Sequence, residues 1–139
     1  GEIGDSSAIL PIGKALVEEK GDKLLVIGYS RGYCEALQAL SGYEATFLDL
    51  CSLKPLDEEA IKKWARKIGK VLIVENVPLQ SSVAESIIRI IMEEGIKAEI
   101  RVVSALDMPL AFSRKLEYEA LPNRERILKE ADSLIGEKL

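Results

Sequence analysis

The sequence predicts an α/β fold in which a mostly parallel sheet is covered by helices on both faces. Short apolar runs with the composition of buried strands alternate with segments that carry apolar residues at helical spacing. The clearest unit is residues 45–74, which predicts a strand, a turn, a helix and a second strand. Two strands joined by a helix run parallel, with a right-handed crossover. Repetition of this alternation along the chain is typical of a parallel-dominated sheet between two helical layers.

The first part of the chain is predicted to supply a tail and an edge strand. Residues 1–8 are polar and rich in glycine, which is typical of a linker or N-terminal tail, so the domain itself is expected to span 9–139. Residues 14–18 suit a short edge strand. This strand should end at the turn formed by Gly21 and Asp22.

A buried strand and a helix are predicted next. Residues 24–28 are apolar and β-branched enough to lie in the centre of a sheet. Ser30 is a residue type that caps helices, so we expect it to begin a helix that reaches Leu40. The residues expected to face the core from this helix are Cys34, Leu37 and Leu40.

The central unit combines two buried strands with an amphipathic helix. Residues 45–50 and 71–74 are the strands. Between them, Asp57 stands where a helix N-cap belongs and Gly69 where a C-cap belongs. The apolar stripe of this helix consists of Ile61, Trp64, Ala65 and Ile68.

A further helix and strand follow. Ser82 and Glu85 have the spacing of a capping box, and the helix they begin should end at Gly95. Residues 98–103 are predicted to be the last strand. The residues of the helix expected to face inward are Ile87, Ile88 and Ile91.

The C-terminal part is predicted to be less regular and then helical. Residues 104–122 show little periodicity and contain a candidate short helix between Leu110 and Glu119. Asn123 is expected to cap the final helix. The apolar stripe of that helix is Ile127, Leu128, Ala131, Leu134 and Ile135.

Composition limits the class of protein. The chain has 139 residues, 47% hydrophobic and 30% charged, as expected for one soluble domain. A net charge of −4 argues against nucleic-acid partners, and no apolar run approaches the roughly 18 residues of a membrane helix. With no signal-peptide pattern, the expected location is cytoplasmic. Cys34 and Cys51 are expected to be buried structural thiols rather than a disulfide or a ligand pair.

Residues 28–32, Gly-Tyr-Ser-Arg-Gly, match the Gly-x-Ser-x-Gly nucleophile elbow in a strand–turn–helix context. A serine nucleophile of this kind needs a histidine to accept its proton, and the sequence contains none. We therefore interpret the motif as a tight turn capped by Ser30. The turn could also bind an anion, with Arg31 adding charge. No residue of this chain is predicted to be catalytic, to bind a cofactor or to ligate a metal.

Polar side chains are expected to gather at the carboxyl ends of the parallel strands, where ligands bind in open α/β sheets. The residues predicted to lie near this edge, as a candidate ligand or partner site, are Ser30, Arg31, Lys54, Glu75, Asn76 and Asp107. The alternative is that these residues belong to ordinary solvated loops. Asp49, in an apolar strand, is expected to need a partner, because an unpaired buried carboxylate is costly.

Residues 106–121 carry more apolar side chains than a lone domain needs to expose, and exposed apolar patches mark interfaces. We expect part of this segment to form a two-fold contact between chains, giving a homodimer. The alternative is that the segment folds back over the sheet as ordinary core. The residues predicted for the dimer contact are Met108, Leu110, Phe112, Leu116 and Tyr118.

Five short motifs together resemble the C-terminal domain of the transketolase family. That family includes transketolase, deoxyxylulose phosphate synthase and the beta subunit of the 2-oxo-acid dehydrogenase decarboxylating component. The motifs are Pro-Ile-Gly-Lys-Ala at 11–15, Leu-Asp-Leu at 48–50, Leu-Lys-Pro-Leu-Asp at 53–57, Val-Leu-Ile-Val-Glu at 71–75 and Leu-Pro-Asn-Arg-Glu-Arg-Ile at 121–127. The resemblance covers about 10–135. It departs from the family at 79–85, where a glycine-rich turn is usual.

The resemblance implies a three-layer α/β/α sandwich whose five-stranded, mostly parallel sheet has its first strand antiparallel. In such enzymes thiamine diphosphate and magnesium bind in other domains, so none is expected here. The C-terminal domain serves dimer assembly and, in the dehydrogenases, docking of the acyltransferase subunit. The implied function is an assembly and docking domain, inactive alone, whose partners are a second copy and thiamine-binding domains or subunits. The alternative is a free-standing regulatory module that binds a small anion or nucleotide at the strand edge.

Overall fold

The computed structural model describes residues 10–109 and 112–136. The predicted tail at 1–8 and Leu110 of the predicted dimer contact lie outside the described residues. In the described part, one five-stranded sheet has the order β1-β3-β2-β4-β5. β1 runs antiparallel to β3, and the other neighbouring strands run parallel. The strands are β1 (Leu16–Glu19), β2 (Leu24–Gly28), β3 (Ala45–Asp49), β4 (Lys70–Pro78) and β5 (Glu99–Ala105).

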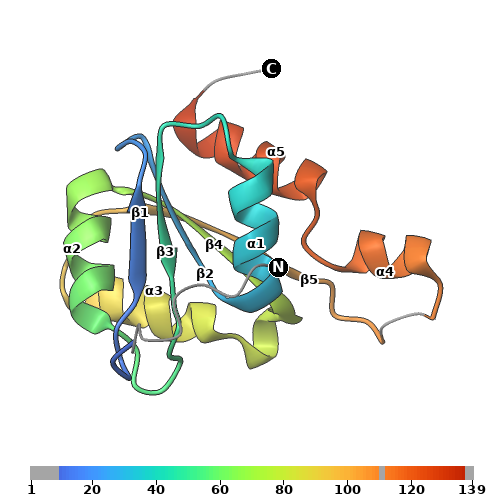
Figure 1. Cartoon of the computed structure of the whole chain (residues 1–139), viewed down its shortest axis with the longest axis horizontal. Coiled ribbons are helices and arrows are strands. Elements are labelled where there is room, and N and C mark those ends of the chain that lie inside the picture. Colours follow the sequence, from blue (N-terminus) through green and yellow to red (C-terminus); the bar gives the residue numbers. More distant parts are fainter. Residues whose placement is uncertain (1–9, 110–111, 137–139) are drawn as a thin grey trace.

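Helices cover both faces of this sheet, as the sequence predicted (Figure 1). One face carries α1 (Ser30–Ala39) and α5 (Arg124–Ile135), and the other carries α2 (Glu58–Ile68) and α3 (Val83–Glu93). A single 3-10 turn, η1 (Leu79–Ser81), precedes α3. The three-layer α/β/α sandwich with an antiparallel first strand is therefore confirmed. Every helix in the described ranges is too short or too polar to span a membrane.

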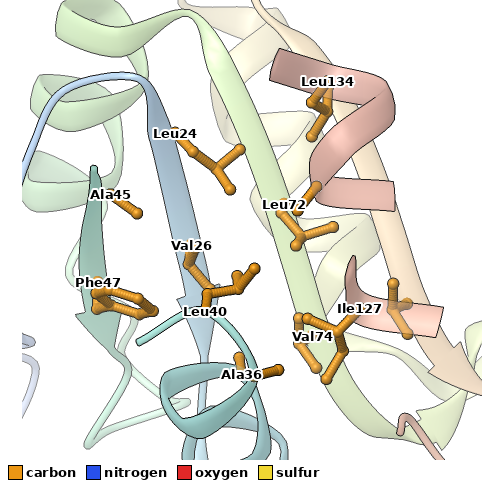
Figure 2. Packing of buried hydrophobic residues seen from close by; sticks show 13 residues of the cluster. Leu24, Val26, Ala36, Leu40, Ala45, Phe47, Leu72, Val74, Ile127 and Leu134 are labelled. Atoms are coloured by element: carbon orange, nitrogen blue, oxygen red, sulfur yellow. The ribbon is translucent and has the colours of Figure 1, made fainter. Parts of the chain in front are cut away.

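The core consists of two apolar clusters, one on each face of the sheet. On the α1 and α5 face, Val26, Leu72 and Val74 lie between Phe47 on one side and Ile127 on the other (Figure 2). These side chains are at most 2% exposed, so they exclude water from the centre of the sheet. The strands are buried on both faces because helices cover both faces, which explains their nearly continuous apolar sequence.

The second cluster lies under α2 and α3. Trp64 is 6% exposed, and together with Ile61 it packs against the sheet as the apolar stripe predicts. The ammonium groups of Lys63 and Lys67 lie over the Trp64 ring, 5.2 and 4.6 Å from its centroid. The indole therefore contacts the core with one side and cations with the other.

Several boundaries differ from the prediction. β4 continues to Pro78, four residues beyond the predicted end at residue 74, and β5 begins at Glu99 and ends at Ala105. The short helix α4 (Arg114–Ala120) begins later than the predicted helix. β1 begins at Leu16 rather than at residue 14. Strand ends depend on pairing with neighbours, which local composition does not encode.

The prediction of two buried cysteines is wrong, because Cys34 and Cys51 are both exposed free thiols. On α1 the buried positions are instead Gly32, Ala36 and Ala39. The helix approaches the sheet so closely that small residues occupy the contact, which turns Cys34 outward. Leu37 and Leu40 face the core as predicted.

Candidate functional site

The turn that follows β2 is built for close packing. A Cβ atom on Gly32 would lie 2.8 Å from the carbonyl oxygen of Val74, and one on Gly28 would lie 3.1 Å from the same atom. Both glycines therefore let α1 rest on β4. This contact explains the two glycines of the Gly-x-Ser-x-Gly motif without a nucleophile.

The prediction that Ser30 caps α1 is wrong. The N-cap position is Tyr29, and no side chain caps the helix there. Ser30 has a φ of 52°, in the left-handed region that non-glycine residues seldom adopt. The tight turn between β2 and α1 places Ser30 one position inside the helix, past the N-cap position from which a side chain bonds the free backbone N–H groups.

Glu75, within β4, links this strand to the start of α3. Its side chain is fully buried, and its carboxylate accepts hydrogen bonds from the hydroxyl of Ser82 and from the backbone N–H of Val83 at 3.2 Å. Burial raises the pKa of Glu75, while hydrogen bonds from Ser82, Ala84, Val83 and Tyr29 act in the opposite direction. The carboxylate thus joins the turn after β2 to the start of α3.

This arrangement replaces the predicted capping box of α3. Ser82 caps the helix as expected, because its Oγ accepts a hydrogen bond from the backbone N–H of Ala84 at 2.9 Å. The carboxylate at the helix start, however, comes from Glu75 on β4 and not from Glu85, which is exposed. The carboxylate at the helix start is therefore supplied by a strand that lies earlier in the sequence.

The other residues predicted for the strand edge lie on different elements: Arg31 on α1, Asn76 in β4, and Lys54 and Asp107 in loops. Arg31 forms ion pairs with Glu35 at 3.6 Å and Glu117 at 3.7 Å. Asp107 accepts a hydrogen bond from Nε2 of Gln80 at 2.9 Å. Lys54 is exposed in the loop after β3. Oδ1 of Asn76 is buried without a hydrogen-bond partner among the described residues.

Register shows which of these residues share the edge. Gly28 pairs with Asp49 on one side and with Val74 on the other, so β2 and β3 end together beside Val74, while β4 continues to Pro78. Ser30 and Glu75 therefore lie just beyond the shared end of β2 and β3. Within residues 10–109 and 112–136, no three His, Cys, Asp or Glu side chains gather in a way that could hold a metal ion.

Asp49 lacks the partner that the sequence led us to expect. Burial raises the pKa of its carboxyl group, and in the described part of the chain no group donates a hydrogen bond to it. The side chain is half-buried, so water can solvate it and the expected cost of an unpaired buried charge is reduced. Tyr33 lies close enough for the negative charge of Asp49 to help raise the pKa of its phenol.

The segment between β5 and α5 presents an apolar surface. We call residues 106–109 and 112–120 the α4 segment. Its large apolar side chains are all at least 45% exposed, and Phe112 is entirely exposed. α4 stands away from the sheet and its covering helices (Figure 1). The exposed apolar residues are Leu106, Met108, Phe112, Leu116 and Tyr118. The alternative that this segment folds over the sheet as core is therefore wrong for these residues.

The base of the α4 segment is nevertheless fixed to the domain. The backbone N–H of Leu106 donates to the carbonyl of Ala120 at 2.8 Å, which closes the segment into a loop. Nδ2 of Asn123 donates to the carbonyl of Tyr118 at 3.2 Å. The ion pair between Arg31 and Glu117 adds a link to α1. The exposed side chains are therefore presented from an anchored base.

Comparison with known proteins identifies the family to which this chain belongs. Residues 13–127 match the family described as "Transketolase, C-terminal domain". The beta subunit of acetoin:2,6-dichlorophenolindophenol oxidoreductase from Bacillus subtilis (strain 168) is 30% identical, over 99% of this chain and 42% of that protein. The mitochondrial pyruvate dehydrogenase E1 component subunit beta from Caenorhabditis elegans is 29% identical, over 92% of this chain and 39% of that protein.

A solved structure agrees in fold. The chain described as "Split gene transketolase, inactive beta4 tetramer" superposes with a TM-score of 0.83, at 19% identity, over 100% of this chain and 48% of that chain. The fold and the match over most of the sequence define a domain from a family of thiamine diphosphate-dependent enzymes. This chain belongs to the transketolase C-terminal domain family. It spans about two fifths of the length of the curated relatives above, at 42% and 39%.

Proposed function

We propose that this chain is an assembly and docking domain of a thiamine diphosphate-dependent enzyme, of the transketolase or 2-oxo-acid dehydrogenase beta-subunit type. The observation that carries the proposal is the exposed apolar surface of the α4 segment. A helix of seven residues is marginal in water by itself, and α4 contributes Leu116 and Tyr118 to the surface rather than to the core. Burial against a partner would stabilise both the helix and its apolar side chains.

The partner that fits the α4 segment best is a second copy of the chain. Closed two-fold dimers are the commonest oligomers, and in them each patch meets its own copy. The charged residues of α4 include both signs, Arg114 and Lys115 beside Glu117 and Glu119, so the contact can avoid like charges. The named relatives are subunits, and one structural neighbour is a tetramer, which supports an assembly function.

The cofactor belongs, in this proposal, to other domains or subunits of the parent enzyme, which would bind thiamine diphosphate and magnesium. The strand edge supports this division of labour, because Arg31 is already paired with carboxylates and Glu75 is buried in a helix cap. If the parent enzyme is a 2-oxo-acid dehydrogenase, the acyltransferase subunit is a further expected partner. The chain alone should therefore be inactive.

Light scattering tests the dimer contact. Phe112→Glu places a charge in the centre of the α4 segment and should halve the mass of the particle, because the charge would have to be buried on association. Phe112 is entirely exposed, so the domain should stay folded, as circular dichroism can verify. Met92→Glu is the matched control, since Met92 is 69% exposed on α3, and it should leave the mass unchanged.

Two results would contradict the proposal. One is a wild-type chain that is monomeric at tens of micromolar; the other is a Phe112→Glu variant that keeps the wild-type mass. A calorimetric titration with thiamine diphosphate and magnesium tests the cofactor assignment separately. No heat of binding is expected, and micromolar affinity would place the cofactor site in this domain instead.

The alternative function, binding of a small anion or nucleotide at the strand edge, has weaker support. In its favour, the N-terminus of α1 has no side-chain cap and Oδ1 of Asn76 has no partner among the described residues. Against it, Arg31 is engaged by Glu35 and Glu117. Isolated high-affinity binding of a nucleotide to the chain would favour this alternative.

A further inference from the structure

The last strand of the sheet, β5, leaves one side of its backbone unpaired. β5 lies beside β4 and has no second neighbouring strand among the described residues. The backbone N–H of Glu99 donates to the carbonyl of Gly69 at 2.9 Å, so Glu99 and every second residue after it point their backbone groups toward β4. The N–H and C=O groups of Ile100 and Val102 therefore point away from the sheet.

The fold satisfies only the carboxyl end of this open edge. Nη2 of Arg126 donates to the carbonyl of Ser104 at 2.7 Å, whereas no described residue bonds the outward groups of Ile100 and Val102. β5 has 7 residues and contains no proline, so it is long enough and regular enough to pair with another strand. An open edge of this kind is a template for an extended segment of another chain.

One face of the β5 edge is apolar. Ile100 and Val102 belong to the cluster under α2 and α3, and both side chains are only half-buried there. A strand added to β5 would lie about 4.8 Å away, and its side chains would cover the exposed part of these two residues. Side chains on this face of the added strand should therefore be apolar. Because side chains alternate along a strand, they would occupy every second position.

The other face of the β5 edge is cationic. A hollow of about 120 Å³ between β5 and α5, which we call the α5 hollow, is lined by Val102, Val103, Arg126, Lys129 and Glu130. Arg126 is half-buried and Lys129 is exposed, and neither forms an ion pair within residues 10–109 and 112–136. Glu130 lies 3.9 Å from Arg101, which offsets its charge. The α5 hollow therefore has an excess of positive charge that a carboxylate would neutralise.

We propose that β5 accepts an extended acidic segment of another polypeptide as an additional strand of the sheet. The unpaired backbone groups select an extended main chain, and the half-buried Ile100 and Val102 select apolar side chains on one face. Arg126 and Lys129 select carboxylates on the other face. A second copy of this chain is a poor occupant, because a two-fold pairing of β5 with its own copy would bring two α5 hollows of like charge together. The inference does not depend on the α4 contact.

Binding of a synthetic peptide to the full chain tests the proposal. The probe is a fluorescent, end-blocked peptide of about eight residues that alternates valine and glutamate, a length sufficient to span β5. Fluorescence anisotropy should show saturable binding that weakens as salt is added, because carboxylates of the peptide pair with Arg126 and Lys129. A peptide that alternates valine and lysine should not bind, since its charges repel these two residues.

Amide hydrogen exchange locates the bound peptide on the sheet. The N–H groups of Ile100 and Val102 should exchange more slowly in the complex, because they gain hydrogen bonds to the added strand. The N–H groups of Arg101 and Val103 face β4 and are already bonded, so their exchange should change little. Slower exchange confined to any other segment would overturn the inference.

Two variants separate the backbone and charge contributions. Val102→Pro removes an outward N–H and leaves the bonds to β4, because proline is tolerated on an edge strand where its nitrogen faces solvent. It should weaken binding about threefold to tenfold, and the matched control Val102→Ala, which keeps the N–H, should weaken it less. Lys129→Glu should weaken binding by about tenfold, whereas Lys54→Glu, in the exposed loop after β3, should leave it unchanged.

The remaining outcomes contradict the inference. Absence of saturable binding at about 200 μM peptide, or equal binding of the lysine peptide, removes the proposed partner. If Val102→Pro lowers the mass of the particle in light scattering, a second copy is the occupant of β5. If Val102→Pro does not fold, Lys129→Glu and hydrogen exchange still decide the result. Phe112→Glu should bind the peptide as wild type does, so failure of the α4 contact is distinguishable from failure of this inference.

Discussion

The carboxylate of Asp57 binds the backbone of Ala15, which lies 42 positions earlier in the chain, at 3.1 Å. Its second oxygen accepts a hydrogen bond from the backbone N–H of Ala60 at 3.2 Å and so caps α2. Lys14 lies 3.7 Å from the same carboxylate. One side chain, only 7% exposed, therefore satisfies a helix end and fixes the start of β1.

Asp57→Ala should lower the free energy of unfolding by about 1–3 kcal/mol, because it removes a cap and leaves the N–H of Ala15 without its partner. Asp57→Asn should cost less, since an amide oxygen can still cap the helix. Urea denaturation measures both. Asp22→Ala, at an exposed aspartate, serves as the control and should change stability by less than about 0.5 kcal/mol. Equal effects of Asp57→Ala and Asp22→Ala would show that the two bonds contribute little.

Trp64→Ala should lower the free energy of unfolding by about 3–5 kcal/mol, the cost of emptying a large buried site. The indole is 6% exposed within the cluster under α2 and α3. Trp64→Phe should cost less because it keeps most of the packing. The midpoints of denaturant unfolding measure both losses. A loss below about 1 kcal/mol for the alanine variant would show that this face of α2 is not packed against the sheet.

The order of elements could be predicted because several helix ends carry their own local signal. Asp57 and Gly69 cap α2, and Asn123 caps α5, as their residue types indicate. The continuous apolar strands likewise follow from burial on both faces. These features depend on residues close in sequence, so a single sequence is sufficient to predict them.

The sequence-based predictions were wrong where contacts with a segment distant in the chain determine the local structure. Ser30 looks like a cap, but the packing of Gly28 and Gly32 on β4 sets the turn and puts Ser30 at positive φ. Cys34 looks like a core residue, but close approach to the sheet favours the small residues of α1. The link from Glu75 to Ser82 joins a strand to a helix start and has no signature in local spacing.

The exposed apolar residues were predicted more fully. The apolar excess of residues 106–121 is visible in the sequence, because so many large side chains occur there without helical or strand periodicity. The edge position of the strand at 14–18 was also predicted, and Leu16 and Val17 are exposed there.

The raised pKa of Tyr33 predicts that the protein loses stability at alkaline pH. Burial, followed by the charges of Asp49 and Glu18, raises the pKa of its phenol from 10.0 to about 12. Between these two values the unfolded chain releases the proton while the folded protein retains it. This contribution to stability is therefore fully present below pH 10, declines as the pH rises, and is lost above about pH 12.

Tyr33→Phe should abolish that component, because phenylalanine has no proton to release. Urea unfolding at about pH 9 and about pH 11 should show a larger drop in stability for wild type than for the variant. Absorbance titration of the phenolate should also lose a component with a midpoint near 12. Identical drops in both proteins would mean that Tyr33 titrates alike in the folded and unfolded states.

Gly32 tests the structural interpretation of the Gly-x-Ser-x-Gly motif. A Cβ atom at this position would lie 2.8 Å from the carbonyl oxygen of Val74 and 3.1 Å from Cα of Glu75. Both neighbours are backbone atoms of a central strand, so neither can move without disturbing the sheet. Gly32→Ala should therefore lower the free energy of unfolding by about 1–3 kcal/mol.

Gly42→Ala is the matched control, because no heavy atom lies within 4 Å of its Cβ position, and its effect should stay within about 0.5 kcal/mol. Denaturation of both variants gives the comparison. Equal small effects would remove the packing explanation for the second glycine and reopen the question of what the motif does.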